Sequence, residues 1–202
     1  MARSRQFDNE KVLEAAESVF WEKGYHPTST RDLTAAMGMT TASVYNAFGD
    51  KRGLFLAALG HYLDHSLHER MARLESTLAP ADAISGFFAD TIARSLGDPL
   101  QRGCMLVNTA LEARGDDPEI RERVAAETLE MEAFFTRCAR AAQDAGTTIS
   151  TLPAADIGKM LLSVALGLRV LARVRPDPDV LFGLARPTLA LLGLPPLKEP
   201  PS

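Results

Sequence analysis

Hydrophobic residues recur along this chain every three to four positions, and no segment shows the sustained alternation of a β-strand. In the first segment the apolar residues from Val12 to Phe20 fall on one helical face, and Gly24 ends it. Glycine, proline and aspartate mark the breaks between later segments. The pattern predicts an all-α fold, with helices over residues 8–23, 29–38, 41–48, 51–74, 80–96, 103–113, 117–145, 154–175 and 178–193.

Two very short helices with a three-residue turn between them stand out near the N-terminus. Helices of about eight residues are not stable alone, so the helices on either side must support them. This is the spacing of a helix-turn-helix, which presents its second helix to the major groove of DNA. The outward residues of that helix are small or hydrogen-bonding, and Asn46 is of the type that pairs with adenine. By spacing alone, the alternative is that residues 29–48 are part of a helical bundle and do not bind DNA.

The overall charge gives no support to nucleic-acid binding. The net charge is −4, and residues 1–52 carry seven basic and seven acidic side chains. Because a DNA-binding surface is usually basic, any such role depends on where the charges lie. Arg31 is in the first turn of the supporting helix, and Lys51 opens the fourth helix. There the free N–H groups of a helix N-terminus would also attract a phosphate.

Several stretches between residues 24 and 55 resemble the N-terminal domain of the TetR family of transcriptional regulators. They are Gly24-Tyr25, Thr28 to Leu33, Ala36 to Thr40, Ser43 to Phe48 and Asp50 to Phe55. The resemblance implies a homodimeric repressor that binds a palindromic operator in double-stranded DNA and is released by a small-molecule effector. The positions that match DNA-facing residues of the family are Arg31, Thr41, Ala42, Ser43, Tyr45, Asn46 and Lys51. Ala47 departs from the family, whose members often carry a histidine or an aromatic residue there.

The resemblance also implies a division into two helical domains. Residues 1–52 form a three-helix helix-turn-helix DNA-binding domain, residues 53–194 form the domain for effector binding and dimerisation, and residues 195–202 form a proline-rich tail that we expect to be frayed. Residues 154–175 are apolar almost all round, so this helix should be buried on every side. We expect it to form part of a four-helix dimer interface that includes Leu161 and Leu168, or alternatively to be a core helix of a monomer.

An effector pocket is expected between the helices at 80–96, 103–113 and 117–145. Aromatic and methionine residues at helical spacing are usually plain core. Asn108 and Thr109, two polar residues on a mostly apolar helix, point more strongly to a ligand, because buried polar groups need hydrogen-bond partners and an effector could supply them. The candidate lining residues are Phe87, Phe88, Ile92, Met105, Leu106, Asn108, Thr109, Met131, Phe134 and Phe135.

Two other groups of residues are candidate sensors. The stretch from Arg102 to Glu112 is similar to a segment in one branch of the family, in which some regulators sense electrophiles through cysteine. Cys104 lies at a predicted helix N-terminus beside Arg102, and both features lower a thiol pKa; an inert buried thiol is the alternative. His61, His65 and His68 fall on one helical face that would suit zinc or copper, although a solvated stripe is the more ordinary explanation.

The sequence contains no motif for catalysis or for a bound cofactor. It lacks a phosphate-binding glycine loop, a nucleophile elbow and a zinc-protease motif, so we expect no enzyme, no cofactor and no resident metal. Two cysteines make no disulfide framework, and neither a membrane span nor a signal peptide is visible, which predicts a cytoplasmic protein. A helical binding protein that does not bind DNA remains the rival class.

Overall fold

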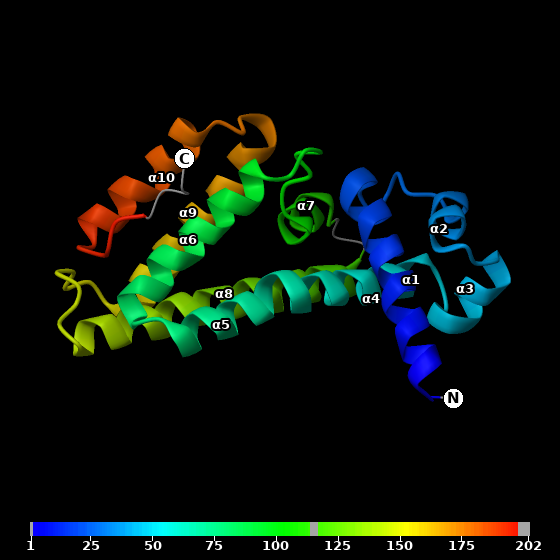
Figure 1. Cartoon of the computed structure of the whole chain (residues 1–202), viewed down its shortest axis with the longest axis horizontal. Coiled ribbons are helices and arrows are strands. Elements are labelled where there is room, and N and C mark those ends of the chain that lie inside the picture. Colours follow the sequence, from blue (N-terminus) through cyan, green and yellow to red (C-terminus); the bar gives the residue numbers. More distant parts are fainter. Residues whose placement is uncertain (1, 114–116, 198–202) are drawn as a thin grey trace. The chain divides into compact units, whose positions relative to one another are not determined.

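The structure, a computed structural model, describes residues 2–113 and 117–197, with side chains from residue 9 onward (Figure 1). The described residues contain no strand, which confirms the all-α prediction. The helices are α1 (Ala2–Lys23), α2 (Thr30–Met37), α3 (Thr41–Phe48), α4 (Lys51–Leu63), the π-helix η1 (Asp64–His68), α5 (Glu69–Thr77), α6 (Pro80–Leu96), α7 (Met105–Glu112), α8 (Pro118–Asp144), α9 (Ala154–Val174) and α10 (Pro178–Leu191).

The chain divides into two compact units. The N-terminal unit contains residues 1–68 and 104–121, and the C-terminal unit contains residues 69–103 and 122–202. Helix α7 therefore belongs with α1 to α4, although it lies far from them in the sequence. The functional boundaries expected at residues 52 and 194 remain a prediction.

In the N-terminal unit, α1 and α4 form the core that carries the two short helices (Figure 1). The rings of Phe20 and Phe55 meet edge to face with centroids 5.0 Å apart, and both side chains are buried. Helix α2 has Leu33 as its buried side chain and α3 has Val44. The apolar spacing of the sequence also predicts Ala36 of α2 and Ala47 of α3 as inward positions; this was wrong, since both are exposed. Each short helix is thus attached to the core by a single buried side chain.

Polar caps define the ends of these short helices. Ser29 and Asp32 form a capping box at the start of α2. Gly38 ends α2 in the left-handed conformation, with φ 63°. The Thr40 hydroxyl accepts the N–H of Ser43 at 3.2 Å and so begins α3. These caps fix where the turn begins and ends.

Three boundaries differ from the sequence prediction. Helix α1 begins at Ala2, earlier than residue 8. The helix predicted over residues 51–74 is interrupted by the π-helical turn η1, which hydrophobic spacing does not reveal. A proline inside a helix predicts a kink or a split, but Pro187 lies inside a continuous α10, so the last helix is not split.

The C-terminal unit packs α6 against α5, α9 and α10. The end of the chain contributes to this packing, because Ser85 Oγ donates to the Pro195 carbonyl at 2.6 Å and Leu197 is buried. The prediction of a frayed tail is therefore wrong for residues 195–197, while residues 198–202 lie outside the described part. None of the described helices is long and apolar enough to cross a membrane.

The α1–α4 core predicts a large effect of one substitution. Phe20→Ala should lower the free energy of unfolding by about 3–5 kcal/mol, because a fully buried ring leaves a cavity behind. Urea unfolding followed by circular dichroism measures this loss. Tyr45→Ala, at an exposed position of α3, is the control and should change stability by less than about 0.5 kcal/mol. Equal losses for the two variants would contradict this account of the core.

Candidate nucleic-acid interface and ligand-binding region

Helix α3 presents an uncharged, hydrogen-bonding face to solvent. Tyr45 has 43% of its surface exposed, whereas the neighbouring Val44, the buried residue of this helix, is 2% exposed. The Ser43 hydroxyl lies 2.9 Å from the Thr40 hydroxyl, so the helix cap orients it. The other predicted base-facing residues of this helix are also exposed: Thr41, Ala42 and Asn46. The face thus combines methyl groups, hydroxyls and one amide, the groups that read base edges in a major groove.

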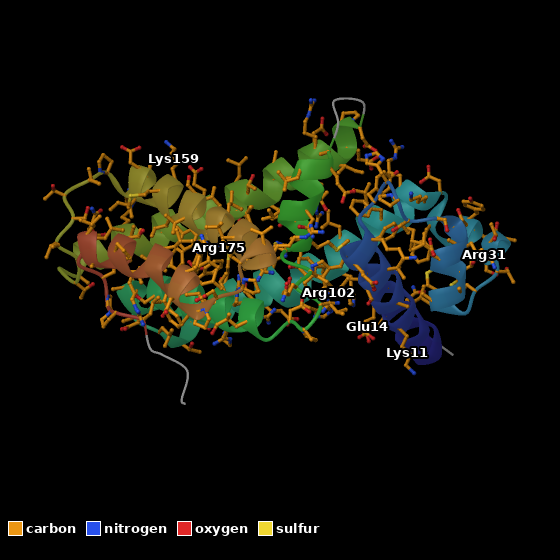
Figure 2. All side chains as sticks on the ribbon, turned by 90° about the horizontal axis from the view of Figure 1, so that it is seen from above. Lys11, Glu14, Arg31, Arg102, Lys159 and Arg175 are labelled. Carbon is orange, nitrogen blue, oxygen red and sulfur yellow. The ribbon has the colours of Figure 1, made fainter. Side chains whose placement is uncertain are left out.

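Helix α2 places a cation beside this face. Arg31 is exposed, and Figure 2 shows it at the α2–α3 end of the N-terminal unit, away from Lys11 and Glu14 on α1. The carboxyl of Asp32 is already engaged, because Lys23 Nζ lies 2.6 Å from it and the Ser29 hydroxyl donates to it. These hydrogen bonds hold the pKa of Asp32 well below its ordinary value. Arg31 is therefore the cation of α2 that is placed to meet a phosphate.

The start of α4 differs in one respect from the sequence expectation. The Asp50 carboxylate accepts the N–H of Gly53 at 2.7 Å, so this part of the helix N-terminus is already capped. A phosphate would meet the Lys51 side chain in place of that N–H. Lys51 Nζ donates to the His26 carbonyl at 3.3 Å and lies 4.8 Å from the centroid of the Tyr25 ring. Partial burial lowers the pKa of Lys51.

Glu112, at the end of α7, takes part in this site, and sequence reasoning gave it no role. Its Oε2 atom accepts the N–H of Tyr25 at 2.8 Å and that of His26 at 3.4 Å. The two partners are more than 80 residues away in the chain. The apolar spacing of α7 therefore carried no signal of this contact.

Cys104 immediately precedes α7 and is partly exposed. The Tyr62 hydroxyl donates to its Sγ atom at 3.5 Å. Arg102, expected to lower the thiol pKa, instead has its guanidinium 3.2 Å from the Asp98 carboxylate. Cys138 is buried, and burial raises its thiol pKa to about 11. Of the two thiols, Cys104 is the accessible one.

The predicted ligand-binding residues fall into two sets. Phe87, Phe88, Phe134 and Phe135 pack against one another in the C-terminal unit, with centroids 4.9–6.3 Å apart. Ile92 and Met131 belong to the same unit and are also buried. Met105, Leu106, Asn108 and Thr109 belong to the N-terminal unit. The Thr109 hydroxyl donates to the Met105 carbonyl at 2.7 Å, so a bond within the helix satisfies it.

The three candidate metal ligands, His61, His65 and His68, do not form a cluster that could hold a metal ion. His61 Nδ1 lies 2.7 Å from Glu17, and His68 Nδ1 lies 2.9 Å from Asp64. The rings of His61 and His65 are 4.6 Å apart, and the π-helical turn η1 contains His65 and His68. Across the described residues, no three or more metal-ligating side chains come together in one group.

Helices α9 and α10 keep an apolar face exposed. The expectation that α9 is buried on every side was wrong for the single chain: Leu161 and Leu168 face its own core, while Val170 and Val174 are 42% and 68% exposed. Leu191 of α10 is 81% exposed. A Cβ added at Gly167 or Gly183, one on each helix, would meet no atom within 4 Å, so another helix backbone has room to approach both. This outer face has the composition of an interface.

Comparisons with known proteins agree with these features. Residues 12–58 match the family model described as bacterial regulatory proteins, tetR family, and residues 80–186 match the model described as tetracyclin repressor-like, C-terminal domain. The chain is 33% identical over 186 residues to the uncharacterised HTH-type transcriptional regulator YezE of Bacillus subtilis, covering 89% of this chain and 93% of YezE. It is 27% identical over 195 residues to the HTH-type transcriptional repressor ComR of Escherichia coli, covering 94% and 90%.

Two solved structures of transcriptional regulators are similar to this chain over most of its length. A cysteine-substituted form of the regulator CifR, complexed with 26-base-pair double-strand operator DNA, has a TM-score of 0.81 and 28% identity, covering 90% of this chain and 95% of that one. A regulator from Chloroflexus aurantiacus has a TM-score of 0.82 and 26% identity, covering 93% and 95%.

The two thiols should differ in reactivity. In the native protein at pH 8, iodoacetamide should modify Cys104 and leave Cys138 unmodified, because burial excludes the reagent and keeps the second thiol protonated. Peptide mass spectrometry over time gives both rates. In urea, where the burial is lost, the two rates should converge. Equal rates in the native protein would contradict the described environments.

Proposed function

The chain belongs to the TetR family of bacterial regulatory proteins and is a DNA-binding transcriptional regulator. From that premise we propose that it is a homodimeric repressor whose affinity for a palindromic operator falls when a small molecule binds its C-terminal helices. The two family models that match this chain confirm the resemblance to the TetR family. The effector, the dimer and the individual contact residues are the parts that we propose.

The observation that carries the proposal is the face of α3. Its exposed side chains hold no charge, so they have no strongly favourable interaction with water that competes with base edges. Asn46 offers both a donor and an acceptor, which suits adenine, and the Ala42 methyl suits thymine. Arg31 is on α2, which precedes α3 in the chain, and Lys51 opens α4, which follows it, so we assign these two cations to the sugar–phosphate backbone beside the groove. This arrangement separates base reading from phosphate binding.

The outer face of α9 and α10 supports the proposed homodimer. Helix bundles bury apolar stripes against one another, and small residues let the helices approach closely. The face offers Val170, Val174 and Leu191 for burial, with Gly167 and Gly183 at the points of approach. Two copies of this face related by a two-fold axis would form a four-helix interface. A dimer with two-fold symmetry would in turn require a palindromic operator.

The aromatic cluster of the C-terminal unit supports the proposed effector site. The Arg70 guanidinium lies 4.1 Å from the centroid of the Phe87 ring, and its Nη1 atom is 3.4 Å from the Thr91 hydroxyl. Small-molecule sites in proteins are mostly apolar with a few placed polar groups, and the phenylalanine cluster with Arg70 and Thr91 beside it has this composition. The cluster is closely packed in the described state, so an effector would have to displace side chains to enter it.

The test of the proposed function is selection of DNA. Binding to a random-sequence duplex library, followed by footprinting of the selected site, should give a two-fold symmetric operator with half-sites about 34–36 Å apart or somewhat more. An asymmetric single half-site, or binding without sequence preference, would overturn the proposal.

The proposed interface predicts which substitutions abolish the dimer. Val170→Arg should give a folded monomer at micromolar concentration in sedimentation velocity, because two charges would be buried against each other in the interface. Leu129→Arg, at an exposed apolar position of α8, is the matched control and should remain dimeric. A wild-type protein that sediments as a monomer would refute the interface.

Lys51 and Asn46 should fail in different ways. Lys51→Ala should weaken binding to all sequences and reduce the slope of log K against log salt by about 0.9 for each phosphate that the lysine neutralises. Asn46→Ala should cost about 1–3 kcal/mol on the operator and relax preference at one base pair, with the slope nearly unchanged. Titrations on operator and scrambled duplexes at three salt concentrations separate the two. The reverse pattern would refute the assigned roles.

A further inference from the structure

One carboxylate fastens the end of α7 to the turn between α1 and α2. Gly24 makes this approach possible, since a Cβ added there would lie 2.2 Å from Glu112 Oε1. The backbone of Gly24 also has a φ of +87°, which favours glycine. A cavity of only about 10 Å³ remains among Tyr25, His26 and the end of α7, too small for a ligand. The end of helix α7 therefore packs directly against the α1–α2 turn.

The same turn holds Lys51 from its other side. The N–H of His26 points to Glu112, whereas its carbonyl accepts from Lys51 Nζ. The Tyr25 N–H also donates to Glu112, and the Tyr25 ring lies under the ammonium group. Two consecutive residues thus connect a carboxylate of α7 with a cation at the start of α4. The charge of Glu112 acts on Lys51 as well, opposing the lowering of its pKa by burial.

We propose that Glu112 is a positioning residue for operator binding, which orders the α1–α2 turn and through it holds Lys51 where it meets a phosphate. Hydrogen bonds to an ionised acceptor are stronger than neutral ones, so the carboxylate is a firm attachment for two backbone N–H groups. A displacement of α7 that withdraws the carboxylate releases the turn and with it the lysine. The inference rests on the proposed function, because it assigns Lys51 a phosphate contact.

A double-mutant cycle on operator DNA tests this connection. Glu112→Ala should reduce operator affinity about tenfold and lower the salt slope toward that of Lys51→Ala. Combined with Lys51→Ala, it should cause no further loss beyond about twofold, since the two residues act on the same contact. Glu112→Gln keeps an oxygen acceptor without the charge and should lose about threefold, with the same non-additivity.

Glu130→Gln is the control for the change in net charge. Glu130 is an exposed carboxylate of α8 in the C-terminal unit, and this substitution should leave both affinity and salt slope as in the wild type. Thermal unfolding identifies variants that do not fold, and Glu112→Gln carries the test if Glu112→Ala is among them. Fully additive effects of the Glu112 and Lys51 substitutions would overturn the proposal, as would a Glu112 variant with wild-type affinity.

Hydrogen exchange supplies a readout that needs no DNA. The amides of Tyr25 and His26 should exchange at least tenfold faster in Glu112→Ala than in the wild type, while amides in the middle of α4 should be unchanged. Unaltered exchange at these two amides would refute the attachment itself. A wild-type protein that binds no selected duplex would instead refute the proposed function, so the two failures are distinguishable.

Discussion

Helices α2 and α3 are each only eight residues long, and neither contains enough hydrogen bonds to be stable in water. Their geometry is imposed by α1 and α4, which meet through Phe20 and Phe55. Helix α2 packs on α1 and α3 packs on α4, and Leu33 and Val44 are buried. Because one buried side chain fixes each short helix, nearly all of the α3 surface remains free for recognition.

Recognition of a polyanion by a protein with a net charge of −4 then depends on placement. The exposed face of α3 that we propose reads bases is neutral, and the proposed phosphate-binding cations, Arg31 and Lys51, belong to the neighbouring helices α2 and α4. The acidic residues elsewhere then contribute only a diffuse repulsion that salt screens. Asp50 and Glu112 lie close to Lys51 and belong to its immediate structure, one as the cap of α4 and the other across the α1–α2 turn. The local field at this corner is therefore set by a few neighbouring groups more than by total charge.

The sequence predicted local features well and distant contacts poorly. Caps, glycine stops and apolar spacing located most helices to within a few residues, because each signal acts within one or two turns of the chain. The same spacing placed Thr41, Ala42, Ser43, Tyr45 and Asn46 on the outward face of α3, and all five are exposed. The pairing of Glu112 with Tyr25 lies beyond such reasoning, since it joins segments brought together only by the fold. Arg102 shows that a short-range contact can also be missed: in the loop before α7 it pairs with Asp98, four residues earlier, an ion pair that helical spacing does not reveal.

The π-helical turn η1 affects how the sequence of this chain should be aligned with those of its relatives. A π-turn holds one residue more than an α-turn, so a relative whose helix is α-helical throughout would have one residue fewer between Tyr62 and Met71. An alignment without a gap there would pair inward positions on one side of the turn with outward positions of the relative. A one-residue gap between residues 64 and 68 restores the correspondence of buried positions at both ends of the helix.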